Sequence, residues 1–479
     1  MRMMSALRSS VALGSLLLAG CAVGPSFERP IAPADAAYAN LPGARPDRQT
    51  VVPGADIPAD WWTLFRSPAL DTLVRRAIAA NPDLEAARAA LRQSQELAKA
   101  DRGAFLPSAS LDASTTRARN PGVLASPLQS NSNLYTLTTA QLNVGYTLDV
   151  FGGIRRQAES SAAAAEAQRF QTEAAYLTLT STVVVAAITE ASLREQIVAT
   201  EKTIAAQAHI LDILRGRLRL GDAARADVAA QQTLLAQTEQ SLPPLQKQLA
   251  QQRDQIAALA GQMPGTEQPR LDLTTLTLPS NLPLSLPARL VDQRPDVRAA
   301  EADLHAAGAQ VGVAIAARLP AITLGGGVGG SSTNFATLLA PANVLWSIVG
   351  GLAAPLFNGG TLRHRQHAAE AAYDQAKAHY RSAVLAAFQN VSDTLAAIGT
   401  DTDALRAAER AERAATDSLA IAQGQARLGA IAPFQVLNAE QAYWQATIAV
   451  LQTRTTLYAD TAALFQSLGG GWWNHSERS

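Results

Sequence analysis

An internal repeat constrains this chain more than any other feature of its sequence. Four short motifs return once, in the same order, in the second half. They are Asn81-Pro82-Asp83-Leu84, Leu106-Pro107, Val150-Phe151-Gly152-Gly153 and Arg219-Leu220-Gly221, matched by Arg294-Pro295-Asp296-Val297, Leu319-Pro320, Leu356-Phe357-Asn358-Gly359-Gly360 and Arg427-Leu428-Gly429. The prolines of the first two motifs have the same spacing in both copies, so chance similarity is a poor explanation. The sequence predicts two copies of one structural unit.

The repeat also sets the expected domain boundaries. We predict a signal peptide over residues 1–20, an N-terminal arm over 21–60, a first repeat over 61–270 and a second repeat over 285–470. The arm is rich in proline and alanine, which is typical of a loop or an extended segment. Length alone would suggest two or three domains, whereas the repeat favours two halves of one.

The start of the chain has the pattern of a secretory signal. Arg2 and Arg8 precede an apolar run that ends at Leu18-Ala19-Gly20-Cys21, and this run is too short to span a bilayer usefully. The pattern resembles a bacterial lipobox, which implies a covalent lipid on Cys21. No intrachain disulfide is possible because Cys21 is the only cysteine, so we expect it to serve as the anchor. The alternative is an ordinary secreted protein with a stray cysteine.

The compartment follows from the residue after this cysteine. Ala22 is not the aspartate that tends to retain related lipoproteins in the inner membrane, so the outer membrane is favoured. Basic and acidic residues balance at 40 each and the basic ones are scattered, so nothing points to nucleic acid. Beyond the signal, the most apolar stretch, 174–191, contains Glu190 and several hydroxyl residues. No transmembrane helix is expected.

Each repeat contains two segments in which apolar residues alternate with polar or small ones. They cover residues 108–115 and 141–148 in the first repeat and 322–329 and 346–353 in the second. This alternation predicts strands, and their lengths are near those that a tilted strand needs to cross a bilayer. The alternative is two soluble hairpins packed on helices. The outer-membrane address and the small or polar second face favour transmembrane strands.

Four strands cannot close a barrel within one chain. An open sheet edge in lipid leaves backbone groups without hydrogen-bond partners, and the smallest known barrels have about eight strands. Two copies would give eight strands with little room inside, and three would give twelve with a possible pore. We therefore favour a trimer.

Two segments are too long for helices of an ordinary globular core. Between Gly153 and Gly221 there is no proline and only one internal glycine, Gly216, and residues 361–428 match this segment in length. A continuous helix there would be about 100 Å long, which implies a coiled-coil or tube geometry.

Shorter helices are predicted to flank the long ones. The returning segments carry heptads, and their members are Val228, Leu235, Leu242, Leu249 and Ile256 in the first repeat and Leu437, Trp444, Leu451, Tyr458 and Phe465 in the second. Helices over 83–104 and 296–317 would stack end to end with them. Pro243-Pro244 predicts a kink or break in the first returning helix.

Five motifs together resemble those of the outer-membrane factor family. They are Cys21-Ala22-Val23-Gly24-Pro25, Trp61-Trp62-Thr63-Leu64-Phe65, Asn81-Pro82-Asp83-Leu84, Leu148-Asp149-Val150-Phe151-Gly152-Gly153 and Pro355-Leu356-Phe357-Asn358-Gly359-Gly360. The most similar branch is the NodT-like lipoproteins of RND-type efflux systems, related to the TolC channel. The resemblance extends from Cys21 to about Gly470.

The resemblance implies a mainly α fold with a transmembrane β-barrel part. In such proteins a homotrimer forms a twelve-stranded barrel in the outer membrane, continued by a long α-helical tube through the periplasm. It also implies docking to a periplasmic adaptor (membrane fusion) protein and an inner-membrane pump, so that drugs or other toxic solutes leave passively. No enzymatic activity and no cofactor beyond the lipid on Cys21 are implied. The alternatives are a lipid-anchored periplasmic coiled-coil adaptor without a pore, and an envelope hydrolase, for which no site constellation is present.

The resemblance places a gate where each long helix turns into its returning partner. At the first turn the candidates are Asp222, Arg225 and Asp227, with Arg427 of the second turn as a cross-repeat partner. The second turn has no carboxylate through Leu437, so Ile431 or Phe434 would narrow the tube instead.

The same turns also carry signals of ordinary helix ends. Gly221 and Gly429 suit left-handed helix ends, and Pro433 suits the first turn of a helix. We expect Asp222 to cap the next helix, and we weight this role above gating.

Two other signals are weaker. The run Gly325 to Gly330 has the GxGxxG spelling of a dinucleotide loop, but no ribose-binding acid follows and a barrel strand is favoured. His364 and His367 lie three apart on a helix without a third clear ligand, so a solvated helix face is favoured over a metal site.

Overall fold

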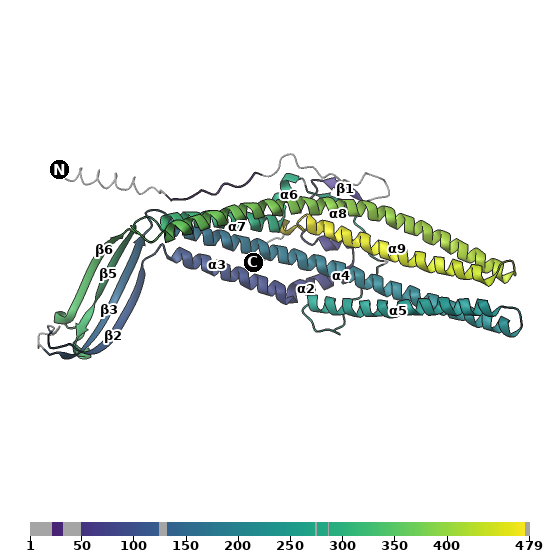
Figure 1. Cartoon of the computed structure of the whole chain (residues 1–479), viewed down its shortest axis with the longest axis horizontal. Coiled ribbons are helices and arrows are strands. Elements are labelled where there is room, and N and C mark those ends of the chain that lie inside the picture. Colours follow the sequence, from purple (N-terminus) through teal and green to yellow (C-terminus); the bar gives the residue numbers. More distant parts are fainter. Residues whose placement is uncertain (1–21, 32–48, 124–131, 274, 286, 475–479) are drawn as a thin grey trace. The chain divides into compact units, whose positions relative to one another are not determined.

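The structure, a computed structural model, describes most of the chain and divides it into two compact units. The described residues are 22–31, 49–123, 132–273, 275–285 and 287–474 (Figure 1). Cys21 and the expected signal peptide lie outside them. Among the described residues, unit 1 contains 22–30, Leu91–Gln168 and Ala300–Tyr380, and unit 2 contains the remainder.

Unit 1 contains a four-stranded antiparallel sheet built from both repeats. Its strands are β2 (Ser108–Arg119), β3 (Leu134–Leu148), β5 (Ala321–Ser332) and β6 (Val344–Ala353). Their order is β2-β3-β5-β6, so β3 of the first repeat pairs with β5 of the second. The four predicted strands are confirmed.

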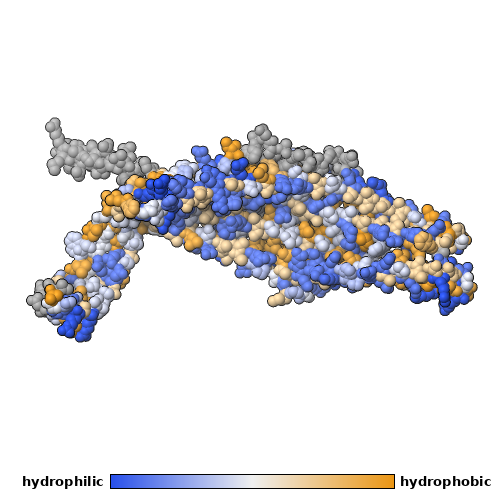
Figure 2. Space-filling model, viewed as in Figure 1, coloured by the Kyte–Doolittle hydropathy of each residue, from blue (hydrophilic) through white to orange (hydrophobic). Residues whose placement is uncertain are grey.

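The two faces of this sheet differ in chemistry. Strand pairing places Leu111 beside Leu142 on one face, and this face also carries Trp346 and Ile348. The side chains of Trp346 and Ile348 are 72% and 83% exposed in the single chain, and hydrophobic residues are visible on the sheet in Figure 2. The other face carries mainly hydroxyl, amide and glycine residues, together with Asp112. A sheet with an exposed apolar face and a polar opposite face is typical of a barrel wall.

Four α-helices of the described chain begin or end in unit 1. The two long ones, α4 (Gly153–Arg219) and α8 (Thr361–Arg427), have 67 residues each, as the sequence predicts. The shorter ones are α3 (Pro82–Gly103) and α7 (Pro295–Ala316). By length and composition alone, α4 could cross a membrane, but 61% of its most apolar window is buried inside the protein, as in a core helix.

Unit 2 contains the returning helices. These are α5 (Arg225–Leu259) and α9 (Pro433–Ser467), with 35 residues each. At the ends of their heptads, Val228, Ile256 and Phe465 are buried. Of the predicted kink or break at Pro243-Pro244, the break is wrong, because α5 continues through both prolines, and the kink stays a prediction. Both prolines are exposed, so water can reach the carbonyls that they leave without a helical partner.

The short helices stack end to end with the returning ones, as predicted. Asn81, which ends α2 (Pro68–Ala80), donates from Nδ2 to the Leu259 carbonyl at the end of α5 (3.0 Å). Its Oδ1 accepts the N–H of Leu84 (2.9 Å) and so caps α3.

The second repeat closes the same junction with a different residue. Arg294, the counterpart of Asn81, donates from Nη1 to the Ser467 carbonyl at the end of α9 (2.8 Å). Two bonds to Asp296 orient the guanidinium. The residue before the repeated proline therefore ties the stacked helices together in both halves.

A small sheet that the sequence did not predict and an aromatic stack complete unit 2. A two-stranded parallel sheet pairs β1 (Thr50–Pro53) with β4 (Asn281–Leu284), and α6 (Pro287–Gln293) follows. Trp61, in the 3-10 helix Trp61–Phe65, is fully buried and stacks on Phe465 of α9 with ring centroids 5.2 Å apart. The stack joins the two repeats in one core, and Ile57 of the N-terminal arm is fully buried as well.

Gly261 tests how tightly the end-to-end junction is closed. Its φ is +68° and a Cβ there would overlap the carbonyl of Ala80, so Gly261→Ala should destabilise the fold by about 2 kcal/mol or more. Gly424→Ala in α8 is the control: nothing lies within 4 Å of its Cβ position, and it should raise stability by up to about 1 kcal/mol. Apparent Tm in detergent measures both. A Gly261→Ala protein as stable as the parent would contradict this account of the junction.

Candidate functional site

Both candidate gate turns have the same backbone geometry. Gly221 (φ +79°) donates its N–H to the Leu218 carbonyl (3.1 Å), and Asp222 donates to the Arg217 carbonyl (2.9 Å). These two bonds form a Schellman motif, which satisfies carbonyls at the end of α4. Gly429 and Ala430 repeat it at the end of α8 with bonds of 3.1 and 2.9 Å. The predicted left-handed helix ends are confirmed.

The capping role predicted for Asp222 is wrong. Helix α5 begins at Arg225, and its N-cap is Ala224. The carboxylate that serves this end is Asp227, whose Oδ2 accepts the Ala224 N–H (3.2 Å). Asp222 lies two residues before the N-cap, outside the position from which a side chain reaches the first-turn N–H groups. Its side chain is exposed.

The remaining candidates lie on the surface or within one helical hairpin. Arg225 and Arg427 are exposed, and in the described part of the chain no ion pair joins Arg427 to either carboxylate of the first turn. Ile431 packs against Ala422 and Val436 of its own hairpin, whereas Phe434 is 56% exposed. A gating role for these residues stays a prediction.

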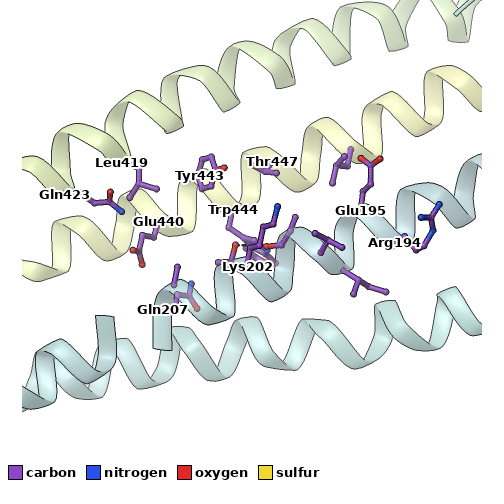
Figure 3. A pocket seen from close by; sticks show the side chains of 16 residues that line it. Arg194, Glu195, Lys202, Gln207, Leu419, Gln423, Glu440, Tyr443, Trp444 and Thr447 are labelled. Atoms are coloured by element: carbon purple, nitrogen blue, oxygen red, sulfur yellow. Dashed lines mark hydrogen bonds between the residues drawn. The ribbon is translucent and has the colours of Figure 1, made fainter. Parts of the chain in front are cut away.

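Sequence reasoning missed a cavity in unit 2. It has a volume of about 590 Å³ and lies among α4, α8 and α9 (Figure 3). Glu440 and Trp444 line it from α9, Gln207 from α4, and Leu419 from α8.

Several buried polar atoms in this cavity have no hydrogen-bond partner within the described residues. They are Gln207 Nε2 and Oε1, Glu440 Oε2, Trp444 Nε1 and Thr447 Oγ1. Burial raises the pKa of Glu440 to about 7, because a low-dielectric setting disfavours the carboxylate. The cavity is therefore a polar defect in the helical core.

A pair of carboxyl groups, Asp401 and Asp460, lies between α8 and α9. Burial, together with a hydrogen bond and like-charge repulsion from Asp460, raises the pKa of Asp401 to about 7. By contrast, Glu190 of α4 is satisfied: it pairs with Arg194 (3.2 Å) and with Arg253 of α5 (3.1 Å). Glu190 thus has two cationic partners, whereas the group that acts on Asp401 is another carboxyl.

The signal that would have revealed these polar positions is the second core position of each heptad. Three residues after Val228 and Leu437 stand Gln231 and Glu440, and both are buried. Gln231 donates to the Gln207 carbonyl (2.8 Å). The heptads above were followed at only one of their two core positions. At the other, Gln231 and Glu440 stand where apolar residues are expected.

The weaker sequence signals have structural explanations. The glycine run Gly325 to Gly330 lies within β5. His364 and His367 lie on α8 with ring centroids 6.1 Å apart. Among the described residues, no group of three or more His, Cys, Asp or Glu side chains could hold a metal ion.

Comparison with known proteins identifies the family. The sequence profile of the outer membrane efflux protein family matches residues 73–262 and 286–470. The chain belongs to this family. It is similar to the pyoverdine export outer membrane protein OpmQ of Pseudomonas putida, with 32% identity over 86% of this chain and 88% of that protein. It is also similar to the toluene efflux pump outer membrane protein TtgF of the same species, with 30% identity over 98% of both chains.

Solved structures of outer-membrane channels have the same fold. The outer-membrane channel OprN superposes with a TM-score of 0.84 and 28% identity, over 94% of this chain and all of that one. The open state of the Neisseria gonorrhoeae channel MtrE gives 0.82 and 25%, over 94% and 99%.

The comparisons confirm the family resemblance, the fold class and the general function. The chain is an outer-membrane component of an efflux system, with a helical part and a barrel part, and it extends into the periplasm. The domain boundaries, the lipid on Cys21 and the gate residues stay predictions.

Ionisation of Glu440 should make the stability of the fold depend on pH. Because its folded-state pKa is raised to about 7, ionised Glu440 destabilises the fold: the penalty is absent below its ordinary pKa and complete above about pH 7. Glu440→Gln should therefore raise the apparent Tm at pH 8 and leave it unchanged at pH 4. Glu239→Gln, at an exposed carboxylate of α5, should change neither. An equal Tm shift at both pH values would mean that ionisation of Glu440 is not the cause.

Proposed function

We propose that three copies of this chain form a passive export duct across the outer membrane. The supporting observation is the sheet of unit 1. Its outer strands, β2 and β6, each pair on one side only, and its apolar face is exposed. In lipid such edges must pair with other copies, because unpaired backbone groups there cost several kcal/mol each. Three copies give twelve strands and an open interior.

We also propose that the duct works with a periplasmic adaptor and an inner-membrane pump. TtgF and similar relatives are named as outer membrane proteins of efflux pumps, which supports such partners. OpmQ is named for pyoverdine and TtgF for toluene. For this chain we propose drugs or other toxic solutes as the cargo, with energy supplied by the pump and no chemistry by the duct.

A lipid on Cys21 would anchor the chain beside the sheet. The next residue, Ala22, lies against Gly152, where a Cβ would come within 2.7 Å of the Ala22 Cα. Gly152 lies between the end of β3 and the start of α4. Arg156 Nε donates to the Val23 carbonyl (3.0 Å) and holds the same segment against α4. The segment after Cys21 is thus held where the sheet ends, which supports an anchor in the same membrane.

Neighbouring positions on β6 test the barrel directly. Ile348 lies on the apolar face and Ser347 on the other. Ile348→Arg should place a charge in lipid, cost about 2–4 kcal/mol, and abolish trimer insertion and conductance. The matched Ser347→Arg should insert and conduct, because its side chain faces water. Planar-bilayer recording and native mass spectrometry measure the outcome. A monomeric parent protein without conductance would defeat the proposed function.

Arg427 tests the gate in the same recordings. If it pairs with carboxylates of the first turn across the tip, Arg427→Ala removes exposed ion pairs worth up to about 1 kcal/mol each. Open probability and mean conductance should then rise roughly twofold to fivefold. The control is Arg413→Ala, an exposed arginine two heptads earlier on α8. Unchanged conductance in Arg427→Ala would remove this residue from the gate.

A further inference from the structure

The polar face of the unit 1 sheet carries one charged side chain. All residues of β2, β3, β5 and β6 are described, and strand pairing assigns each to a face. Only Asp112, Arg117 and Arg119 are charged, all in β2. The side-chain period of two places Asp112 on the polar face and both arginines on the opposite one. No cation on these strands therefore balances Asp112 on its own face.

Neighbouring side chains hold the Asp112 carboxylate in place. Asn143, across the strand pair, donates from Nδ2 to Asp112 Oδ2 (2.7 Å), and the Ser110 hydroxyl donates to the same oxygen (3.1 Å). Both are neutral donors, so they orient the carboxylate without neutralising its charge. The negative charge is fixed at one level of the sheet.

Glycine on β5 makes room for this arrangement. Gly327 pairs with Asn143, and a Cβ at Gly327 would overlap the Gln141 amide and lie 2.9 Å from Asn143 Oδ1. A side chain at this position would displace the two amides, including the one that holds Asp112. The glycine therefore leaves the polar face open at the level of the carboxylate.

We propose that Asp112 is a charge-selectivity residue of the duct, and that three copies form a ring favouring cationic over anionic solutes. This inference rests on the proposed trimeric barrel. Twelve strands spaced about 4.8 Å apart and tilted about 40° give a backbone radius of about 12 Å. The carboxylates would then lie within about one Debye length of the axis at 0.1 M salt, where their field is not fully screened.

Thiol reactivity beside Asp112 tests the local field independently of the gate. Ser114→Cys lies two residues away on the same face, and Ala113→Cys lies between them on the opposite face. Reconstituted protein is treated with a cationic or an anionic methanethiosulfonate of similar size, with the unsubstituted chain as the blank. The measured quantity is the ratio of the cationic to the anionic reaction rate at position 114.

The ratio at Ser114→Cys should fall at least about threefold when Asp112→Asn is added, and should be retained with Asp112→Glu. In 1 M salt, where the Debye length is about 3 Å, the difference should largely disappear. An unchanged ratio with Asp112→Asn would overturn the inference and leave the duct intact. If Ala113→Cys reacts as fast as Ser114→Cys, the two faces are not separated by lipid, and the proposed barrel fails together with the ring.

Discussion

The unpaired edges of a four-stranded sheet are the constraint on which the other features depend. Water can satisfy the outer backbone groups of β2 and β6, but hydrocarbon cannot. Because β3 and β5 come from different repeats, one chain joins its halves at the centre of the sheet and leaves one edge from each half. In the proposed trimer, these two edges would pair with copies of the chain and close the ring. The apolar outward face and the polar opposite face follow from the same strand period.

In unit 2 the constraint is to join short helices into a continuous flank for the long ones. A helix end leaves carbonyls without partners, and stacking a second helix on it would bury them. The chain solves this at the repeated proline, where Asn81 and Arg294 each bond the last carbonyls of a returning helix. The two residues differ in charge and size, so the repeat has kept the interaction and changed the chemistry. Gly261 and Gly469 provide the close approach that both junctions need.

Secondary structure that depends on local sequence patterns was predictable, whereas structure that depends on residues far apart in the sequence was not. The strands, the long helices and the glycine turns follow from period, length and backbone preference. The break at Pro243-Pro244 was wrong because exposure removes much of the penalty for two prolines in a helix. The cap predicted for Asp222 was wrong because the helix begins later than the turn motif suggests, and Asp227 bonds its N-cap residue instead. The pairing of β1 with β4 joins segments more than 200 residues apart, and no periodicity reports it.

Polar residues at heptad core positions lower the free energy needed to separate the helices. In an apolar interface, separation exposes hydrocarbon to water and has no compensating gain. Around Glu440, separation would instead let Gln207, Trp444 and Thr447 make the hydrogen bonds that they lack when packed. Gln207 brings α4 of the first hairpin into this polar contact, whereas Glu190 of the same helix already has two ion-pair partners. In the proposed duct, the contact of α4 with α9 at this cavity therefore costs less to separate than an apolar contact of the same size.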